Sequence, residues 1–430
     1  MGSDLHRTIS AVWRIESAKV IAGVARIVRD VGVAEEIAQD AFVSALEQWP
    51  ASGVPDRPGA WLMAAAKNRA VDHLRRGKLF ERKQDEMGRE VEARERLGAA
   101  AIEAAADDEV GDDLLRLMLV ACHPVLSTEA RVALTLRLLG GLTTEQIARA
   151  FLVAEPTVAA RIVRAKRTLA GGQVAFEVPR GADLRQRLAS VLEVVYLVFN
   201  EGYAATAGED WMRPGLCDDA LRLGRILATL VPAEPEVHGL VALMEIQAAR
   251  IHARTGPGGE PVLLADQNRA LWDRLLIGRG LAALDRAESL STSRGPYTLQ
   301  AAIAACHARA LTAESTDWVR IVALYGALAA VAPSPIVELN RAVAVSMASG
   351  PAAGLALVEA LASDARLADY HLLPAVRGDL LSKLGRLEEA RAAFDRAAEL
   401  ARNARERALL HDRARRAALG APPTPSSKAP

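Results

Sequence analysis

The fold of this chain is decided at residues 142–169, which read LTTEQIARAFLVAEPTVAARIVRAKRTL. Thr143 is a good N-cap and Gln146 completes a capping box, so a helix is expected to begin here. A short turn follows, and Pro156 suits the first turn of a second helix that ends near Leu169, because its missing N–H costs nothing there. Five residues fall where the two helices would pack: Ile147, Ala148, Leu152, Val158 and Ile162.

Two helices joined by a short turn form the helix-turn-helix arrangement, whose second helix enters the DNA major groove. An ordinary helical hairpin is the alternative, since the first helix alone would fit either. The second helix favours DNA, because residues 156–172 contain no acid. Their bases are Arg161, Arg164, Lys166 and Arg167.

Charge is balanced over the whole chain, with 53 basic and 53 acidic residues, but it is not evenly spread. Residues 61–83 carry seven bases against two acids, and residues 85–113 turn acidic. Electrostatic interactions are screened over about 10 Å at cellular salt, so local patches matter more than the total. Two basic patches separated by an acidic connector indicate a nucleic-acid-binding organisation.

Composition points to an all-α protein that works without a cofactor. Ala, Leu and Arg dominate, and only 4% of the residues are aromatic. The three cysteines, Cys122, Cys217 and Cys306, are scattered, which argues against a disulfide framework and against a metal site. No apolar stretch reaches the roughly 18 residues of a membrane span, and the first residues lack a signal peptide, so a cytoplasmic protein without membrane contact is expected.

Two further helices are expected in residues 8–80. Residues 33–46 form an amphipathic helix with Ile37, Ala41, Phe42, Val43 and Leu46 on its packed side and Glu35, Glu36, Gln39 and Asp40 on its polar side. The next helix begins near Pro58 and places Trp61, Asn68, Asp72 and Arg75 within a stripe of about 60°. Single-stranded bases can stack on a tryptophan ring for about 1–3 kcal/mol, although Trp61 could also be a partly buried anchor.

A family resemblance follows from these segments. Residues 122–169, CHPVLSTEARVALTLRLLGGLTTEQIARAFLVAEPTVAARIVRAKRTL, resemble region 4 of extracytoplasmic-function sigma factors, which reads the −35 promoter element. The resemblance implies that Thr157, Arg161 and Arg164 lie at the DNA surface, with Lys166 and Arg167 on phosphate. The chain departs from the family at Ala154, Ala159 and Ala160, where relatives carry capping or polar residues.

Two segments of the first unit resemble the same family. AEEIAQDAF, residues 34–42, resembles region 2.2, which docks on core RNA polymerase, and this implies docking roles for Glu36, Gln39 and Asp40. AWLMAAAKNRAVDHLRRGK, residues 60–78, resembles regions 2.3 and 2.4, which capture the −10 element. The −10 residues implied are Trp61, Asn68, Asp72, Arg75 and Arg76. The implied partners are promoter DNA and the β′ coiled coil and β flap of the polymerase.

The C-terminal half carries a tetratricopeptide-like pattern. Leu381, Gly385, Ala390 and Phe394 follow its alternation of small and large residues, and Gly350 lies 35 residues before Gly385, close to the roughly 34-residue period. Helical solenoids present concave surfaces and rarely hold catalytic groups. The resemblance extends to sigma factors with such an extension, for which we expect a regulatory or docking module with a protein or a small molecule as its ligand. Four residues could mark a pocket or merely cap helices: Asn200, Glu201, Tyr203 and Asp266.

The expected domains are a sigma region 2 unit (8–80), a charged linker (81–109), a region 4 helix-turn-helix (110–172), a helical extension (180–418) and a disordered tail (421–430). The expected function is promoter recognition and transcription initiation, without enzymatic activity. A ligand-responsive helix-turn-helix activator is the alternative, but it leaves AEEIAQDAF and AWLMAAAKNR unexplained. An enzyme is disfavoured because no nucleophile or metal spacing accompanies the scattered histidines, His238, His252, His307 and His371.

Overall fold

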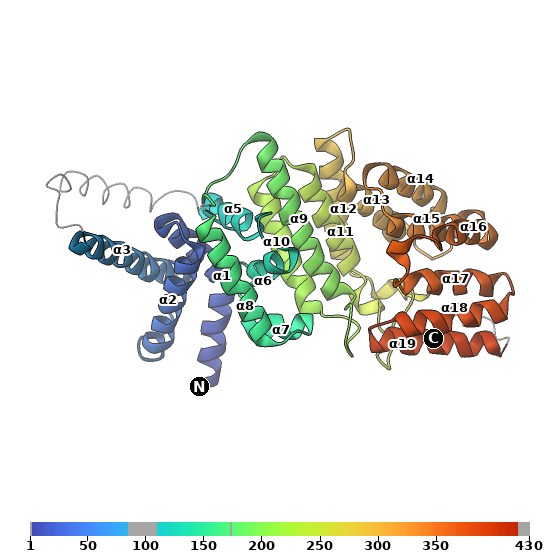
Figure 1. Cartoon of the computed structure of the whole chain (residues 1–430), viewed down its shortest axis with the longest axis horizontal. Helices are drawn as coiled ribbons and strands as arrows, with labels where there is room; N and C mark the ends of the chain where they lie inside the picture. Colours follow the sequence, from blue (N-terminus) through green and yellow to red (C-terminus); the bar gives the residue numbers. More distant parts are fainter. Residues whose placement is uncertain (1, 85–109, 173, 420–430) are drawn as a thin grey trace. The chain divides into compact units, whose positions relative to one another are not determined.

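A computed structural model describes residues 2–84, 110–172 and 174–419 of the chain. Within these ranges every regular element is an α-helix or a short 3₁₀-helix, which confirms the all-α prediction (Figure 1). The helices form two compact units, the first up to Leu197 and the second from Val198. No helix of the described ranges has the length and apolar character that a membrane crossing requires.

Three long helices begin the first unit: α1 (Gly2–Val28), α2 (Val31–Ser52) and α3 (Pro58–Gln84). Asp30 caps α2, because its carboxylate accepts a hydrogen bond from the backbone N–H of Val33 at 3.0 Å. Helix α2 runs on to Ser52, so Pro50 lies in its last turn. Large side chains from all three helices fill the core between them: Ile9, Ile21, Trp49 and Leu62.

Four shorter helices follow in the same unit: α5 (Val110–Ala121), α6 (Thr128–Leu138), α7 (Thr144–Phe151) and α8 (Glu155–Gly171). The predicted capping box is confirmed, since Thr143 and Gln146 exchange side-chain and backbone hydrogen bonds at the start of α7. Helix α5 packs on α1, where Arg26 forms a 3.3 Å ion pair with the buried Asp113. Burial raises the pKa of Asp113, and Arg26 opposes that rise.

Helix α9 (Gly181–Tyr203) begins in the first unit and ends in the second. Its first half is fixed to the shorter helices, because the Ser190 hydroxyl donates a 2.6 Å hydrogen bond to the carbonyl oxygen of Cys122. Arg131 of α6 donates to Ser190 and, at 2.9 Å, to Glu193. The helix that starts the C-terminal extension is therefore anchored by the backbone carbonyl of Cys122, which follows α5, and by the Arg131 side chain of α6.

The second unit opens with α10 (Pro214–Leu230), α11 (Pro235–Ala248), α12 (Arg274–Leu290) and α13 (Pro296–Arg309). Helix α11 is buried over most of its surface because it packs against α10, α12 and α13. Two glycines allow this close packing: a Cβ on Gly239 would lie 2.5 Å from Thr298 Oγ1, and one on Gly280 would lie 2.6 Å from Ile246 Cγ1. Residues 249–273 between α11 and α12 are irregular and contain three 3₁₀ turns.

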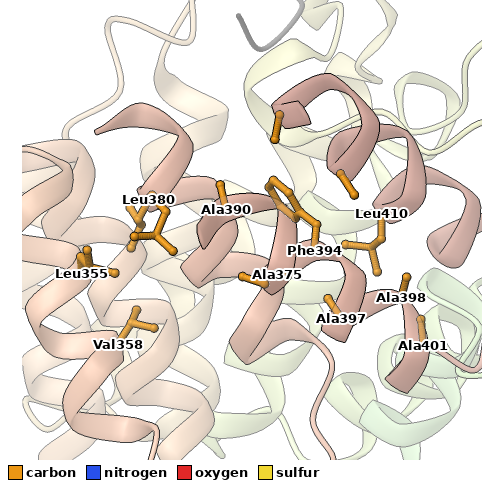
Figure 2. Packing of buried hydrophobic residues seen from close by; sticks show 14 of the residues in the cluster. Leu355, Val358, Ala375, Leu380, Ala390, Phe394, Ala397, Ala398, Ala401 and Leu410 are labelled. Atoms are coloured by element: carbon orange, nitrogen blue, oxygen red, sulfur yellow. The ribbon is translucent and has the colours of Figure 1, made fainter. Parts of the chain in front are cut away.

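The remaining elements of this unit are α14 (Trp318–Val331), α15 (Pro335–Ser349), α16 (Pro351–Leu361), α17 (Leu372–Lys383), α18 (Leu387–Leu400) and α19 (Ala404–Ala418). Gly350 and Gly385 have φ values of 94° and 75° in the turns within two successive helix pairs, so the predicted 35-residue spacing marks equivalent turns. Phe394 and Leu410 are buried in the cluster shown in Figure 2. The Phe394 ring lies where a Cβ on Gly378 would come within 2.8 Å, so this glycine leaves room for the ring.

The turn between α18 and α19 is tied back to the loop that follows α9. Asn403 is fully buried, and its amide donates to the carbonyl oxygens of Ala205 at 3.2 Å and Asp210 at 2.8 Å. The backbone N–H of Ala404 donates to the carbonyl oxygen of Gly208 at 3.0 Å. The last helical pair of the second unit therefore closes onto the unit's first loop.

Candidate promoter and polymerase interfaces

Helix α3 has a buried side and an exposed polar side. Leu62, Ala66 and Ala70 recur at every fourth position and are 1% exposed or less, so they fix the helix against α1 and α2. The structure brings four of the predicted −10 residues together on the exposed side: Asn68, Asp72, Arg75 and Arg76. Farther along α3, the side chains of the basic residues Lys78, Arg82 and Lys83 lie outside the described part of the structure.

Trp61 begins this polar side and is only half-buried. Its ring meets that of Trp49 edge-on, with ring centroids 5.4 Å apart, and Trp49 is 1% exposed. Sequence reasoning missed Trp49, although an aromatic residue at the end of an amphipathic helix was a signal for it. The neighbouring Leu62 belongs to the core. The buried Trp49 ring therefore supports one side of Trp61, and part of the Trp61 surface stays accessible.

Helix α2 exposes Glu36 and Asp40 and leaves Gln39 half-buried. The prediction that Val43 packs inside is wrong, because Val43 is 49% exposed. The position that packs is Ser44, whose hydroxyl accepts a 2.7 Å hydrogen bond from Arg69 of α3. This bond holds the acidic helix and the basic helix in fixed register.

A buried carboxylate on α2 joins the helix-turn-helix to the first three helices. Glu35 is 4% exposed and accepts hydrogen bonds from Arg137 Nε at 2.6 Å and from Gln39 Nε2 at 2.7 Å. Its second oxygen forms a 2.6 Å ion pair with Lys166 Nζ of α8. We call Glu35, Gln39, Arg137 and Lys166 the Glu35 cluster.

The Glu35 cluster corrects two sequence predictions. Glu35 was expected on the polar side of α2, but it is buried. Two cations from α6 and α8 compensate its charge. Lys166 was expected on DNA phosphate, but its side chain turns toward Glu35 and only 21% of it is exposed. Lys166 of α8 thus helps to hold the helix-turn-helix against the first three helices.

The rest of α8 presents a cationic outer face. Val158, Ile162, Ala165 and Leu169 are buried at helical spacing, which confirms the predicted packing side. Of the predicted −35 residues, Thr157, Arg164 and Arg167 are exposed and Arg161 is half-buried. Within the described part of the chain, neither Arg164 nor Arg167 forms an ion pair, so both guanidinium groups are free for an external anion.

The turn before α8 differs from the expectation at Leu152. This residue caps the C-terminus of α7 in the left-handed region, with φ of 51°, and 53% of its surface is exposed. The prediction that Leu152 packs between the two helices is therefore wrong. Ala154, at the N-cap of α8, makes no side-chain cap, as its residue type requires.

Cys122, which follows the last residue of α5, is buried. The Cys122 thiol is buried, lies 3.3 Å from the Thr135 hydroxyl, and has its pKa raised to about 12 by burial. No group of three or more metal-binding side chains occurs among the residues that the structure describes.

Comparison with known families assigns the same segments. Sigma-70 region 2 matches residues 16–79, and Sigma-70 region 4 matches residues 116–169. Residues 187–288 match DUF6596, a family of unknown function. No solved structure matches this chain.

Three relatives extend the comparison. An uncharacterised protein of Rhizobium meliloti (strain 1021) is 46% identical over 386 residues, or 90% of each chain. The ECF RNA polymerase sigma factor SigK of Mycobacterium ulcerans (strain Agy99) is 31% identical over 159 residues, 35% of this chain and 78% of that protein. The probable ECF RNA polymerase sigma factor SigI of Mycobacterium tuberculosis (strain CDC 1551 / Oshkosh) is 29% identical over 175 residues, 40% of this chain and 58% of that protein.

A basic three-helix unit followed by a helix-turn-helix, with both sigma regions matched, defines a sigma-type transcription factor. The chain belongs to the extracytoplasmic-function (ECF) family of RNA polymerase sigma factors, and it carries a C-terminal extension that contains DUF6596.

Proposed function

We propose that this sigma factor binds core RNA polymerase through α2 and recognises promoter DNA through α3 and α8. The single observation that carries the proposal is the separation of three polar surfaces on one compact unit: acidic on α2, mixed and basic on α3, and cationic on α8. Each surface is backed by buried side chains of its own helix, so its polar groups are positioned before any partner binds.

The polymerase surface consists of Glu36, Gln39 and Asp40. Glu36 and Asp40 are one turn apart on α2 and both exposed, while Gln39 is oriented by its hydrogen bond to Glu35. Charged groups of this kind steer association and fix its register. The β′ coiled coil of the polymerase is the proposed partner of this surface, and the β flap that of the helix-turn-helix unit.

The −10 surface consists of Trp61, Asn68, Asp72, Arg75 and Arg76. Arg75 lies 3.8 Å from Asp72, so this arginine is oriented along the exposed side of α3. The half-buried Trp61 ring can stack a base released from the duplex, while Arg75 and Arg76 neutralise phosphates. A tryptophan supported by Trp49 offers one rigid stacking platform.

The −35 surface consists of Thr157, Arg161, Arg164 and Arg167. A guanidinium group can bind guanine O6 and N7 with two hydrogen bonds, which contributes about 1–3 kcal/mol of discrimination. Arg164 and Arg167 are exposed and without an ion-pair partner in the described part of the chain, so neither must break an internal contact first.

A matched pair of variants tests the two roles. Arg164→Ala should weaken binding to −35 DNA by about 1–3 kcal/mol and leave polymerase association unchanged. Asp40→Arg should do the reverse. Arg149→Ala and Asp56→Arg serve as controls, because both change exposed charges outside the three surfaces.

Binding to core polymerase and run-off transcription from a promoter measure the outcomes. Equal loss of −35 DNA binding and of polymerase association in either variant would contradict the division of roles. An activator that does not replace sigma would fail to co-purify with core polymerase. If this chain fails to co-purify with core polymerase, the proposal as a whole is overturned.

We also propose that the C-terminal extension regulates the sigma unit or docks a partner for it. Support comes from α9, one continuous helix whose first half is bonded to α5 and α6 and whose last residues belong to the second unit. A chain cut after Leu197 keeps these bonds, whereas a cut near residue 175 would remove them. The product that ends at Leu197 should fold and should give a transcriptional output different from that of the full chain. Unchanged output would make the extension dispensable for regulation.

A further inference from the structure

Three arginines gather around aromatic rings in the second unit, at the irregular segment between α11 and α12. Arg254 Cζ lies 3.5 Å from the ring centroid of Tyr203. Arg250 Cζ lies 5.9 Å from the same ring and 5.8 Å from the Trp272 ring. Arg269 Cζ lies 4.7 Å from the Trp272 ring. We call Arg250, Arg254 and Arg269 the arginine cluster.

Two members of the arginine cluster are buried, and none of the three is paired with a carboxylate of the described residues. Arg250 and Arg254 are each 9% exposed, and no member forms a salt bridge with a described residue. Arg250 donates to the Tyr203 hydroxyl at 2.8 Å, and Arg254 donates to the Tyr203 carbonyl oxygen at 2.9 Å. Arg269 donates to the backbone carbonyl oxygens of His307 and Ala310 at 2.7 and 2.6 Å.

Other buried charges of the same unit are paired, so the cluster is an exception within its own surroundings. Glu245 is 1% exposed and receives Arg225 at 2.7 Å and Arg279 at 3.4 Å. Glu201, two residues before Tyr203, is already bonded to Arg213 and Thr206. An uncompensated buried charge is costly, because it loses its hydration and gains no counter-charge.

The pKa shifts at this site follow from the same excess of positive charge. Burial lowers the pKa of Arg254 and of Arg269, and the nearby Arg250 lowers both further; Glu314 partly offsets this at Arg269. Burial lowers the pKa of His307 to about 4, with Arg250 and Arg269 adding to that fall. The site therefore favours an added negative charge.

The rings and guanidinium groups also hold donors that lack acceptors. Three buried nitrogen atoms at this site have no hydrogen-bond partner among the described residues: Arg250 Nε, Trp211 Nε1 and Trp272 Nε1. Arg254 Cζ lies 5.2 Å from the Trp211 ring, which places this second indole beside the cluster. All three orphaned groups donate, so the complement they require is rich in acceptor oxygens.

We propose that the arginine cluster binds the phosphate group of a small molecule. Guanidinium groups bind phosphate with two parallel hydrogen bonds, and a group of charge near −2 compensates several arginines better than a monocarboxylate does. The burial of Arg250 and Arg254 excludes the backbone of duplex DNA as the ligand. The inference goes beyond the promoter function and does not depend on it, because every residue from which the site is argued belongs to the second unit.

The test uses the full chain, without DNA or polymerase. Inorganic phosphate and adenosine monophosphate are titrated separately at pH 7 and constant ionic strength, with chloride and acetate as reference anions. Each phosphate compound should raise Tm in a saturable manner and change tryptophan emission, because ligands that bind only the folded state stabilise it. The compound that binds more tightly identifies free phosphate or a phosphate monoester as the source of the group.

Variants assign the binding to the cluster. Arg250→Gln should lower phosphate affinity about tenfold or more, the loss expected for a charged hydrogen-bond partner. Arg391→Gln, an exposed arginine of α18, should leave affinity unchanged. If Arg250→Gln fails to fold, Trp272→Phe keeps all three arginines but removes one donor, so it should give a smaller Tm shift with phosphate and a smaller change in emission.

Two results would overturn the proposal. One is a Tm that responds to phosphate no more than to chloride or acetate at equal ionic strength. The other is an Arg250→Gln protein that folds and binds phosphate as tightly as the wild type. Neither result bears on the promoter function, which is read from DNA and polymerase binding.

Discussion

The Glu35 cluster gives a sharp prediction for the substitution Glu35→Gln. This change keeps the size of the side chain and removes its charge. Arg137 Nε and Lys166 Nζ, both 2.6 Å from the carboxylate oxygens, would then face a neutral amide. We expect the first unit to lose stability, because two cations drawn toward a buried position would no longer be compensated.

The magnitude follows from burial. Removing one partner of a buried ion pair costs about 3–5 kcal/mol when the other stays buried. Here the side chains of Arg137 and Lys166 are 23% and 21% exposed, so water can compensate them in part. We therefore expect a loss of about 2–3 kcal/mol, which lowers the Tm of a unit of this size by about 5–10 °C.

Thermal unfolding of the full chain measures the loss, and hydrogen exchange locates it. Faster exchange should appear in α2, α6 and α8 and be absent from α14–α19. Glu36→Gln is the matched control, since Glu36 is the next residue of the same helix and is exposed. The double variant Glu35→Gln/Lys166→Met should recover part of the stability, because one uncompensated cation is removed.

A Glu35→Gln protein as stable as the Glu36→Gln control would refute the reasoning. Strict additivity with Lys166→Met would refute it equally, since residues in direct contact are expected to couple by about 0.5–3 kcal/mol.

Two further predictions concern the second unit. Phe394→Ala should destabilise the second unit by about 3–5 kcal/mol in thermal unfolding, because the ring fills the space beside Gly378 and packs under Arg413. The control Val319→Ala, at a position 73% exposed, should be nearly neutral. Comparable losses of stability in the two variants would contradict the assigned core. Stability should fall by up to about 3 kcal/mol as the pH drops from 6.5 to about 4, because the unfolded chain protonates His307 before the folded chain does. His307→Gln should flatten that part of the pH profile of urea unfolding while the exposed His411→Gln does not, and identical profiles for the wild type and His307→Gln would rule out the effect.

Local sequence rules predicted the local structure of the first unit well. The capping box at Thr143 and Gln146 and the start of α8 near Pro156 depend on contacts within a few residues, so they could be read from the chain. The exposed side of α3 likewise follows from helical periodicity alone. The same holds for the small and large residues around Phe394 in the repeat.

The failures of prediction arise where the partner is distant in sequence. Nothing in the pattern of α2 separates Glu35 from Glu36, and only the approach of α6 and α8 decides which of the two is buried. Leu152 reads as a packing residue, yet the turn requires a left-handed conformation there that turns it outward.

The arginine cluster was missed for a related reason. Tyr203 drew attention as a possible pocket residue, but the arginines around it come from another segment. Arg250 and Arg254, four residues apart after the apolar helix α11, were the available signal. Their lack of acidic partners became visible only once the fold brought them to the rings.

The bond network of Asn403 changes how the repeats of the extension should behave. In an open array of helical pairs each end can fray or be trimmed without disturbing the other. Here the amide of Asn403 holds the loop that carries Trp211, so the last turn of the array stabilises its first. The extension should therefore unfold in one cooperative transition. A destabilising substitution near its C-terminus should also destabilise its N-terminal loop, beside the guanidinium group of Arg254.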